Sequence, residues 1–321
     1  MSHKSRIVVV GSHAQGLFMR VQRIPGPDET VLGWDYQEAL DGGKGSHMAI
    51  ACSRLGQPTS FVGCVGQDRL GERGIGWMHE AGVDLTYLKR SAKTHTGVGF
   101  VVIDPAGVPA IAVAMGANAD LTVADIEAAE PLLAQARVML TVFEIPIAVA
   151  LFAARLAKRH GITTILTPAP AEPLPPAALA DVDILAPNAG EARTLLGLTA
   201  ETQIEPLELA SACQQRFGIP RVVVTCGKQG AVVADRAERY HVPPLQVTAV
   251  DTPGAGDAFA AGLATALARG APFELAARFG NVIGAYAVTI RESIPAFPTS
   301  NQLKRFISSH NLEPDLANLA A

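Results

Sequence analysis

The segment 251–257 (DTPGAGD) has the composition of an anion-binding turn, and the helical run 260–269 follows it. Small residues that open a helix present free backbone N–H groups, and the helix dipole adds positive potential there. We therefore expect Gly254, Ala255 and Gly256 to stabilise an anion such as a transferring phosphoryl group. Asp257 lies in the same turn, where it can accept a proton from a nearby hydroxyl. The alternative is that this carboxylate only caps the helix.

The longer segment 251–259 (DTPGAGDAF) resembles the signature of the PfkB carbohydrate-kinase family, the ribokinase-like kinases. Other features match the family in the same order along the chain. They are the turn with Gly42, Gly43 and Lys44, the acid Glu144, the pair Asn188 and Glu191, the loop with Thr225, Gly227 and Gly230, and Asn281. The resemblance runs from about residue 6 to 308, so it implies a single ribokinase-like kinase domain over residues 1–321.

The resemblance implies a role for each matching residue. Gly42, Gly43, Lys44 and Glu144 would bind the sugar, and Thr225, Gly227, Gly230, Gly256 and Asn281 would bind ATP. Asn188 and Glu191 would act near the phosphates, with Glu191 reaching Mg²⁺ through water. The turn at Gly42 is not a Walker A loop, because the Gly-x-x-x-x-Gly-Lys-[Ser/Thr] spacing is absent.

The family mechanism follows from these positions. Asp257 would take the proton from a primary hydroxyl while the amides of residues 254–257 stabilise charge on the γ-phosphoryl group. Magnesium would bridge the phosphates. A lid would close over the sugar and exclude water, which limits ATP hydrolysis.

The sugar side of the chain departs from ribokinases. They carry Asn-Ala-Asp after the first strand, where this chain has Ala14, Gln15 and Gly16, and His47 stands where a sugar-contacting Asn is expected. The family Asp binds vicinal ribose hydroxyls, so Gly16 predicts that D-ribose is a poor substrate unless His13, Gln15 or His47 compensates. The alternative for His13 and His47 is a surface or supporting role. A metal site is disfavoured, because no third ligand lies near them in sequence.

A monovalent-cation site is also implied by the resemblance, in a weakened form. The family's potassium site would use Asp251 and backbone carbonyls at Pro253, Ala287 and Ile290. A hydroxyl that ligates the ion in ribokinases is Ala296 here, and a nearby family glycine is Glu292. We therefore expect weaker potassium activation than in a typical ribokinase, unless carbonyls and water are sufficient.

The elements that must position these residues alternate along the chain. Short apolar runs predict buried strands at 7–10, 61–65, 163–166, 182–185 and 222–225, and helical spacing appears at 48–55, 123–134, 147–160 and 207–217. This alternation predicts a mainly parallel sheet with helices on both faces. With the resemblance, the expected fold is a three-layer α/β/α sandwich with a small β-sheet lid.

Two segments interrupt the alternation. Residues 29–40 and the pair 98–103 and 108–114 alternate as half-buried strands do, and the pair is joined by a hairpin signal at 104–107. They fit either an antiparallel edge of the main sheet or a separate lid. The resemblance favours a lid formed by residues of about 14–40 and 95–114, and it implies a homodimer through that lid.

Composition restricts the possible partners. The 321 residues are 49% hydrophobic and 17% charged, and the net charge of −4 comes without a long basic run, so we expect neither a nucleic-acid nor a membrane partner. The apolar run 7–10 is too short for a signal sequence, and no run approaches the roughly 20 residues of a membrane span. The expected location is the cytoplasm.

The sequence therefore predicts an ATP-dependent kinase for a small sugar or polyol. A nucleoside kinase or a 2-keto-3-deoxy-sugar-acid kinase of the same family remains an alternative. A non-catalytic sugar- or nucleotide-binding regulator is disfavoured, because such a protein has no need of the Asp257 turn together with Asn188 and Glu191.

Overall fold

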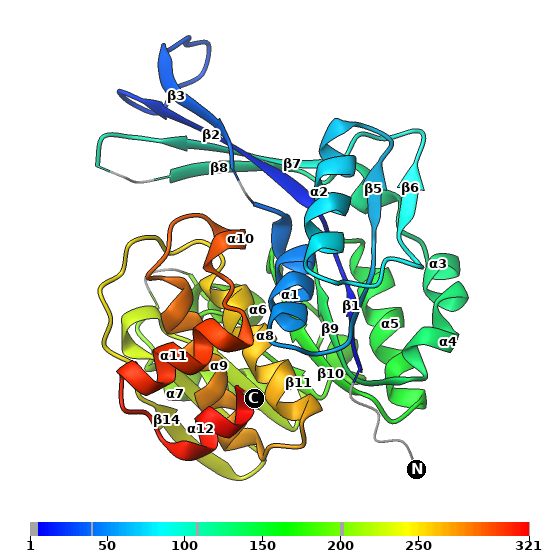
Figure 1. Cartoon of the computed structure of the whole chain (residues 1–321), viewed down its shortest axis with the longest axis vertical. Helices are drawn as coiled ribbons and strands as arrows, with labels where there is room; N and C mark the ends of the chain where they lie inside the picture. Colours follow the sequence, from blue (N-terminus) through cyan, green and yellow to red (C-terminus); the bar gives the residue numbers. More distant parts are fainter. Residues whose placement is uncertain (1–5, 40, 107–108, 200–201, 321) are drawn as a thin grey trace.

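The computed structural model describes residues 6–39, 41–106, 109–199 and 202–320. Within them, a central sheet has the strand order β14-β13-β12-β11-β10-β9-β1-β4 (Figure 1). These strands are β1 (Arg6–Val10), β4 (Thr59–Val62), β9 (Ala136–Val142), β10 (Thr163–Thr167), β11 (Ile184–Leu185), β12 (Arg221–Thr225), β13 (Ala231–Asp235) and β14 (Glu238–Val242). Neighbours pair in parallel except at β12/β13 and β13/β14, which are antiparallel.

Side chains of the central strands alternate between two hydrophobic cores. In β1, Ile7 and Val9 face one core while Val8 and Val10 face the other, and all four are fully buried. The first core is covered by α1 (Gly43–Arg54), α8 (Ala255–Ala268), α9 (Phe273–Ala287), α11 (Ser300–Ser309) and α12 (Pro314–Leu319). The second is covered by α3 (Val123–Ala128), α4 (Glu130–Leu133), α5 (Ile147–Arg159), α6 (Ala189–Leu196) and α7 (Pro206–Phe217). This arrangement is the predicted three-layer α/β/α sandwich.

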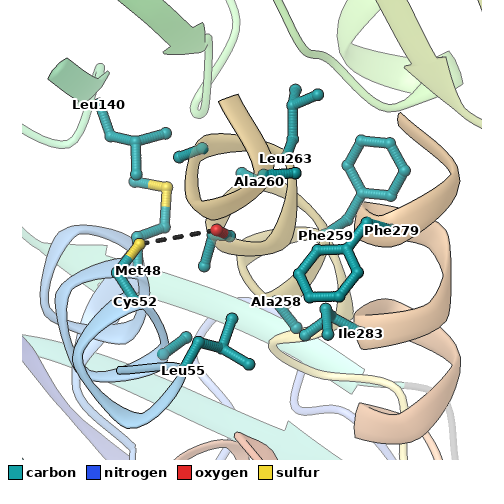
Figure 2. Close-up of a cluster of buried hydrophobic side chains, with 14 of the residues drawn as sticks. Met48, Cys52, Leu55, Leu140, Ala258, Phe259, Ala260, Leu263, Phe279 and Ile283 are labelled. Carbon is teal, nitrogen blue, oxygen red and sulfur yellow. Dashed lines mark hydrogen bonds between the residues drawn. The ribbon is translucent and has the colours of Figure 1, made fainter. Parts of the chain in front are cut away.

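The packing of α1, α8 and α9 fixes the part of the first core that lies beneath the site. Figure 2 shows Met48 and Cys52 of α1, with Leu55 directly after this helix, on one side of α8, and Phe279 and Ile283 of α9 on the other. The Cys52 thiol lies 3.7 Å from the carbonyl oxygen of Ala261. Helices α8 and α9 approach closely, because a Cβ on Gly262 would lie only 2.9 Å from the Cα of Gly280. Helix α8 is thus packed between α1 and α9, and α1 and α8 both contribute to the site.

A second sheet, with the order β3-β2-β7-β8, projects from the body of the molecule (Figure 1). It consists of β2 (Ala14–Val21), β3 (Gly33–Glu38), β7 (Gly97–Ile103) and β8 (Pro109–Ala114). The predicted lid strands therefore form a sheet of their own and not an edge of the central sheet. Leu40, Gly107 and Val108, which belong to the predicted strand and hairpin segments, lie outside the described residues.

The lid is tied to the body by helix α2 (Arg69–Glu80). Arg69 and Arg73 both bond to the Glu38 carboxylate at the end of β3, at 2.6 Å and 2.7 Å. Hydrogen bonds and charge from Arg69, with a further contribution from Arg73, lower the pKa of Glu38 to about 2. The short elements β5 (Cys64–Gly66), β6 (Lys89–Ser91), η1 (Gly116–Asp120), η2 (Pro176–Leu179), η3 (Gly227–Gln229) and α10 (Ser293–Ala296) complete the fold.

Two of the predicted elements are wrong in detail. The run 61–65 is not one strand, because Gly63 separates β4 in the central sheet from β5 in a small sheet with β6. A side chain at Gly63 would lie 2.6 Å from the carbonyl oxygen of Gly11, so the chain can change direction there only with glycine. The run 123–134 is two helices, since α4 starts anew with Pro131 in its first turn. In the described part of the chain, no helix is long and apolar enough to cross a membrane.

Candidate active site

The glycine-rich turn is the N-terminus of α8, which starts at Ala255, five residues before the predicted helical run. Gly254 caps the helix with φ of +79°, a left-handed conformation that favours glycine. Ala255, Gly256 and Asp257 form the first helical turn, whose backbone N–H groups have no partner within the helix. Asp257 is 5% exposed. The turn therefore presents N–H donors beside a buried carboxylate, as expected.

Two basic side chains from α1 lie against Asp257. Lys44 Nζ is 3.9 Å from Oδ1, and His47 Nδ1 is 2.8 Å from Oδ2. The charge of Asp257 raises the pKa of Lys44 above its usual value, against the opposing effect of burial. The predicted sugar-binding and catalytic residues are thus brought together at one carboxylate.

The start of α1 can reach this position because of its glycines. Gly43 has φ of +73°, and a Cβ on Gly45 would lie 2.4 Å from the backbone N of Ser12. Gly42 is the N-cap, and its backbone N lies 2.8 Å from His47 Nε2. The glycine turn therefore packs directly on the loop after β1 and points the first turn of α1 toward Asp257.

His47 also contacts a second carboxylate. Its Nε2 lies 2.7 Å from Oδ1 of Asp41. The Gly42 N–H donates to Nε2, which favours a neutral ring, but the two carboxylates have the larger effect on the protonation of His47. Burial acts to lower the pKa of His47, whereas Asp41 and Asp257 raise it to about 10. His47 is therefore an imidazolium at neutral pH, held between Asp41 and Asp257.

Glu144 lies on the same side of Asp257 as the glycine turn. Its Oε2 accepts hydrogen bonds from Ser12 Oγ at 2.6 Å and from the backbone N of Lys44 at 3.1 Å. Burial raises the pKa of Glu144, and the nearby charge of Lys44 opposes that rise. The predicted sugar-side acid is thus joined to the turn that carries Lys44.

A cavity of about 780 Å³ opens on the other side of Asp257. Its lining includes the predicted residues Lys44, Asn188, Glu191, Thr225, Gly227, Gly230, Gly254, Ala255, Gly256, Asp257 and Asn281. Its volume suits a cofactor of nucleotide size. Gly42, Gly43, His47 and Glu144 are not part of the lining and form a neighbouring polar group, joined to the cavity through Lys44 and Asp257.

Asn188 and Glu191 form a reciprocal capping box at the start of α6. The Asn188 side chain accepts from the backbone N of Glu191, and the Glu191 carboxylate accepts from the backbone N of Asn188, each at 2.8 Å. This arrangement stabilises the helix N-terminus. Both residues also line the cavity, so their oxygen atoms are available to a hard cation such as Mg²⁺ if the capping bonds rearrange.

The distant part of the lining comes from β12, η3 and α9. Gly230 has φ of +82°, and a Cβ there would lie 2.2 Å from the carbonyl oxygen of Val242, so this turn requires glycine. Asn281 Nδ2 donates to the carbonyl oxygen of Pro243 at 2.9 Å. That bond holds the start of the loop 243–247, from which residues 244–247 line the cavity.

The predicted cation residues lie beside the α8 turn. Asp251 accepts hydrogen bonds from the backbone N of Thr252 at 3.0 Å and of Glu292 at 3.1 Å. Glu292 adopts φ of +63° and ψ of 150°, a conformation rarely found outside glycine. Ala296 is buried and brings no hydroxyl to the group. The described residues contain no cluster of three or more His, Cys, Asp or Glu that could hold a metal ion.

Of the three residues that the sequence offered as compensation for the missing side chain at Gly16, only His47 contacts Asp257. His13 is 1% exposed and packs edge-on to Trp77 of α2, and burial lowers its pKa to about 4, so it is neutral. Gln15 is fully buried and donates to the carbonyl oxygens of Gly16 and Ala39. Neither side chain contacts Asp257 or Lys44. Sequence reasoning missed Asp41, although a charged residue directly before the glycine turn was a signal for it.

The chain matches the pfkB family of carbohydrate kinases over residues 4–300. It is 31% identical over 304 residues to the ribokinase of Haemophilus influenzae, covering 95% of this chain and 99% of that protein. It is 28% identical to the deoxyribokinase of Salmonella typhi, covering 94% of this chain and 98% of the other. The structure of Arabidopsis thaliana ribokinase complexed with ribose and ATP has a TM-score of 0.84 and 28% identity, covering 94% of this chain and 98% of that one.

Proposed function

The chain belongs to the pfkB family of carbohydrate kinases, and we propose that it transfers the γ-phosphoryl group of ATP to a hydroxyl of a small sugar or polyol with Asp257 as general base. The family makes it an ATP-dependent carbohydrate kinase. The observation that carries the proposed residue roles is the position of Asp257. It lies in the first turn of α8, between the cavity and the polar group of Lys44, His47 and Glu144.

In the proposed reaction, the acceptor hydroxyl gives its proton to Asp257 as its oxygen attacks phosphorus. The backbone N–H groups of Gly254, Ala255, Gly256 and Asp257 stabilise charge on the transferred group. Lys44 adds a positive charge on the acceptor side, 3.9 Å from the base. Mg²⁺ would screen the phosphates when bound, and the oxygen atoms of Glu191 and Asn188 would hold it, partly through water.

The cavity is the proposed site for ATP. Thr225, Gly227, Gly230 and Asn281 line it away from Asp257, together with the loop 244–247. One relative named above, the Arabidopsis thaliana ribokinase, is described with ribose and ATP, which supports a nucleotide and a sugar as the ligands of this chain. A monovalent cation would be held by Asp251 and the carbonyls of Pro253, Ala287 and Ile290.

The acceptor is proposed to be neutral. Beyond Asp257 lie the carboxylates of Asp41 and Glu144; together with Asp257 they outnumber the two cations, Lys44 and His47. A sugar acid would bring a further negative charge to this group, which like-charge repulsion disfavours. A neutral sugar or polyol is therefore favoured over a 2-keto-3-deoxy-sugar acid, and the comparisons do not favour a nucleoside.

A homodimer through the lid is also proposed. The lid sheet exposes large apolar side chains: Trp34 is 44%, Phe100 51% and Ile111 62% exposed. Such a surface is typical of an interface. The expected result is a dimer by light scattering that Ile111→Glu weakens, with Glu127→Gln on exposed α3 as a control; a monomer at micromolar concentration would reject it.

The function is tested by measuring ADP release with a panel of neutral sugars, polyols, sugar acids and nucleosides. We expect saturable ADP release with at least one neutral sugar or polyol, and a phosphomonoester in the product by ³¹P NMR. Preference for a sugar acid or a nucleoside would shift the proposal to the corresponding alternative. ADP release that no acceptor stimulates would contradict it.

A further inference from the structure

Asp41 lies in the space that a side chain at Gly16 would occupy. A Cβ built on Gly16 would be 2.5 Å from Oδ2 and 3.1 Å from Cβ of Asp41. Real Cβ atoms do not approach an oxygen so closely, so the present position of Asp41 requires glycine at position 16; the same Cβ would also lie 2.7 Å from the Phe18 ring. Gly16 belongs to lid strand β2 and Asp41 precedes α1, and thus the carboxylate sits where the lid meets the body.

The orientation of Asp41 is fixed by two partners. Its Oδ1 lies 2.7 Å from His47 Nε2, and its carboxylate also accepts a hydrogen bond from the Ser293 side chain. Burial acts to raise the pKa of Asp41, but the charge of His47 and these hydrogen bonds outweigh it and lower the pKa. The group is therefore a fixed anion, and its side chain is still 24% exposed.

Asp41 is linked to the base through one imidazole ring. The chain of contacts runs from Asp41 Oδ1 through His47 Nε2 and Nδ1 to Asp257 Oδ2, with distances of 2.7 and 2.8 Å. Two hydrogen bonds and a ring place the carboxylates roughly 7 Å apart. A buried trio of two carboxylates and an imidazolium is weak evidence for stability, since burying charges is costly. A role in binding accounts for it better.

We propose that Asp41 is a specificity-determining residue of the acceptor site, whose carboxylate accepts hydrogen bonds from hydroxyls of a small neutral sugar or polyol while His47 holds it in register with Asp257. The assignment rests on the proposed kinase function. The ligand class follows from the chemistry: a fixed carboxylate is an acceptor only, so it binds hydroxyl donors and repels acids. Its distance from Asp257 requires a ligand long enough to reach both carboxylates.

The test uses Asp41→Asn, with Asp315→Asn at an exposed position of α12 as the matched control. The probes are D-ribose, D-ribulose, D-fructose and erythritol, each with its monodeoxy analogues, and kcat and KM are measured from ADP release. For the best probe, we expect Asp41→Asn to lower kcat/KM roughly 10- to 150-fold, the value of a hydrogen bond to a charged group. The loss should fall mainly on KM, and Asp315→Asn should match the wild type.

The monodeoxy analogues separate binding from a structural role. The analogue that lacks the hydroxyl bound by Asp41 should lose less than about threefold on Asp41→Asn, because it never made that bond. An equal loss for the parent sugar and all its analogues would overturn the assignment, as would a loss below about threefold for the best probe.

Gly16→Ala gives a second measurement that keeps every charge. Its Cβ would displace the Asp41 carboxylate, so it should reproduce the same dependence on one hydroxyl. If Asp41→Asn does not fold, Gly16→Ala alone tests the assignment. An equal loss of kcat/KM for the parent sugar and all its analogues would again overturn it. If the wild type phosphorylates no probe, the proposed kinase function itself fails, a result distinct from a uniform effect of the variants.

Discussion

His47 Nδ1 lies 2.8 Å from Oδ2 of Asp257, so the carboxylate proposed as the base is hydrogen-bonded to a buried imidazolium. The other ring nitrogen contacts Asp41. An amide at position 47 could donate a hydrogen bond to Asp257 without adding a charge. His47 instead adds a positive charge, which also pairs with the Asp41 carboxylate. The acceptor side of this kinase is therefore built around a charged group of three residues.

This group makes stability depend on pH. The pKa of His47 is raised from 6.5 to about 10 in the folded protein. A raised pKa means that the stabilising charge is fully present below about pH 6.5 and is lost as the pH rises through about 10. We expect the urea midpoint of the wild type to fall between these values more steeply than that of His47→Asn. Parallel curves for the two proteins would contradict the charged state of His47.

Activity toward D-ribose depends on positions 16, 41 and 47 together. We expect D-ribose to be a poor substrate of the wild type. The double variant Gly16→Asp, His47→Asn should not improve it, because the new carboxylate would collide with Asp41. Adding Asp41→Leu should raise kcat/KM for D-ribose by about tenfold or more over the double variant. Equal values for double and triple variants would show that Asp41 does not occupy this space.

Potassium activation should be weaker than in a typical ribokinase. Ala296 brings no hydroxyl, and the Asp251 carboxylate already accepts two backbone N–H bonds. Fewer free oxygen ligands weaken a site for a hard cation. Initial rates are measured against potassium chloride, with sodium or tetramethylammonium chloride holding ionic strength constant. Strong, saturable activation specific to potassium would contradict the prediction and show that carbonyls and water are sufficient.

Glu292 carries backbone strain that glycine would relieve. Its φ of +63° with ψ of 150° costs a residue with a Cβ about 1–3 kcal/mol. Glycine also raises the entropy of the unfolded chain, and this offsets part of the relieved strain. We therefore expect Glu292→Gly to gain about 1 kcal/mol of unfolding free energy. Glu292→Ala removes the carboxylate but keeps the Cβ and should gain nothing. A lower melting temperature for the glycine variant than for the alanine variant would argue against strain.

The glycine-rich turn at the start of α8 and the layers of the fold were predictable because they depend on local sequence. The segment 254–257 forms the N-terminus of α8, and the continuous apolar run 7–10 indicates a strand that is buried on both faces. The alternation of the lid strands distinguished them from the parallel strands, but only the family resemblance favoured a separate lid over an antiparallel edge of the main sheet. The antiparallel strands β13 and β14 were not predicted, because an apolar run does not indicate whether a strand pairs in parallel or antiparallel.

The acceptor side was less predictable because it depends on contacts across the chain. Asp41 and Gly16 are 25 positions apart, and only their packing shows that one carboxylate occupies the space of another side chain. His13 and Gln15 were expected as compensating residues, but their side chains point into the interior. The charge of His47 likewise follows from Asp257, which lies 210 positions later.

The most direct test of the account is the kcat of Asp257→Asn with the best neutral acceptor of the panel. ADP binding by calorimetry and the melting temperature are measured alongside, since the variant also loses charge next to Lys44 and His47. The account predicts ADP affinity close to that of the wild type and a kcat lower by roughly 10²- to 10⁴-fold, the usual contribution of a positioned general base. A folded Asp257→Asn variant with a kcat within a few-fold of the wild type would contradict the account.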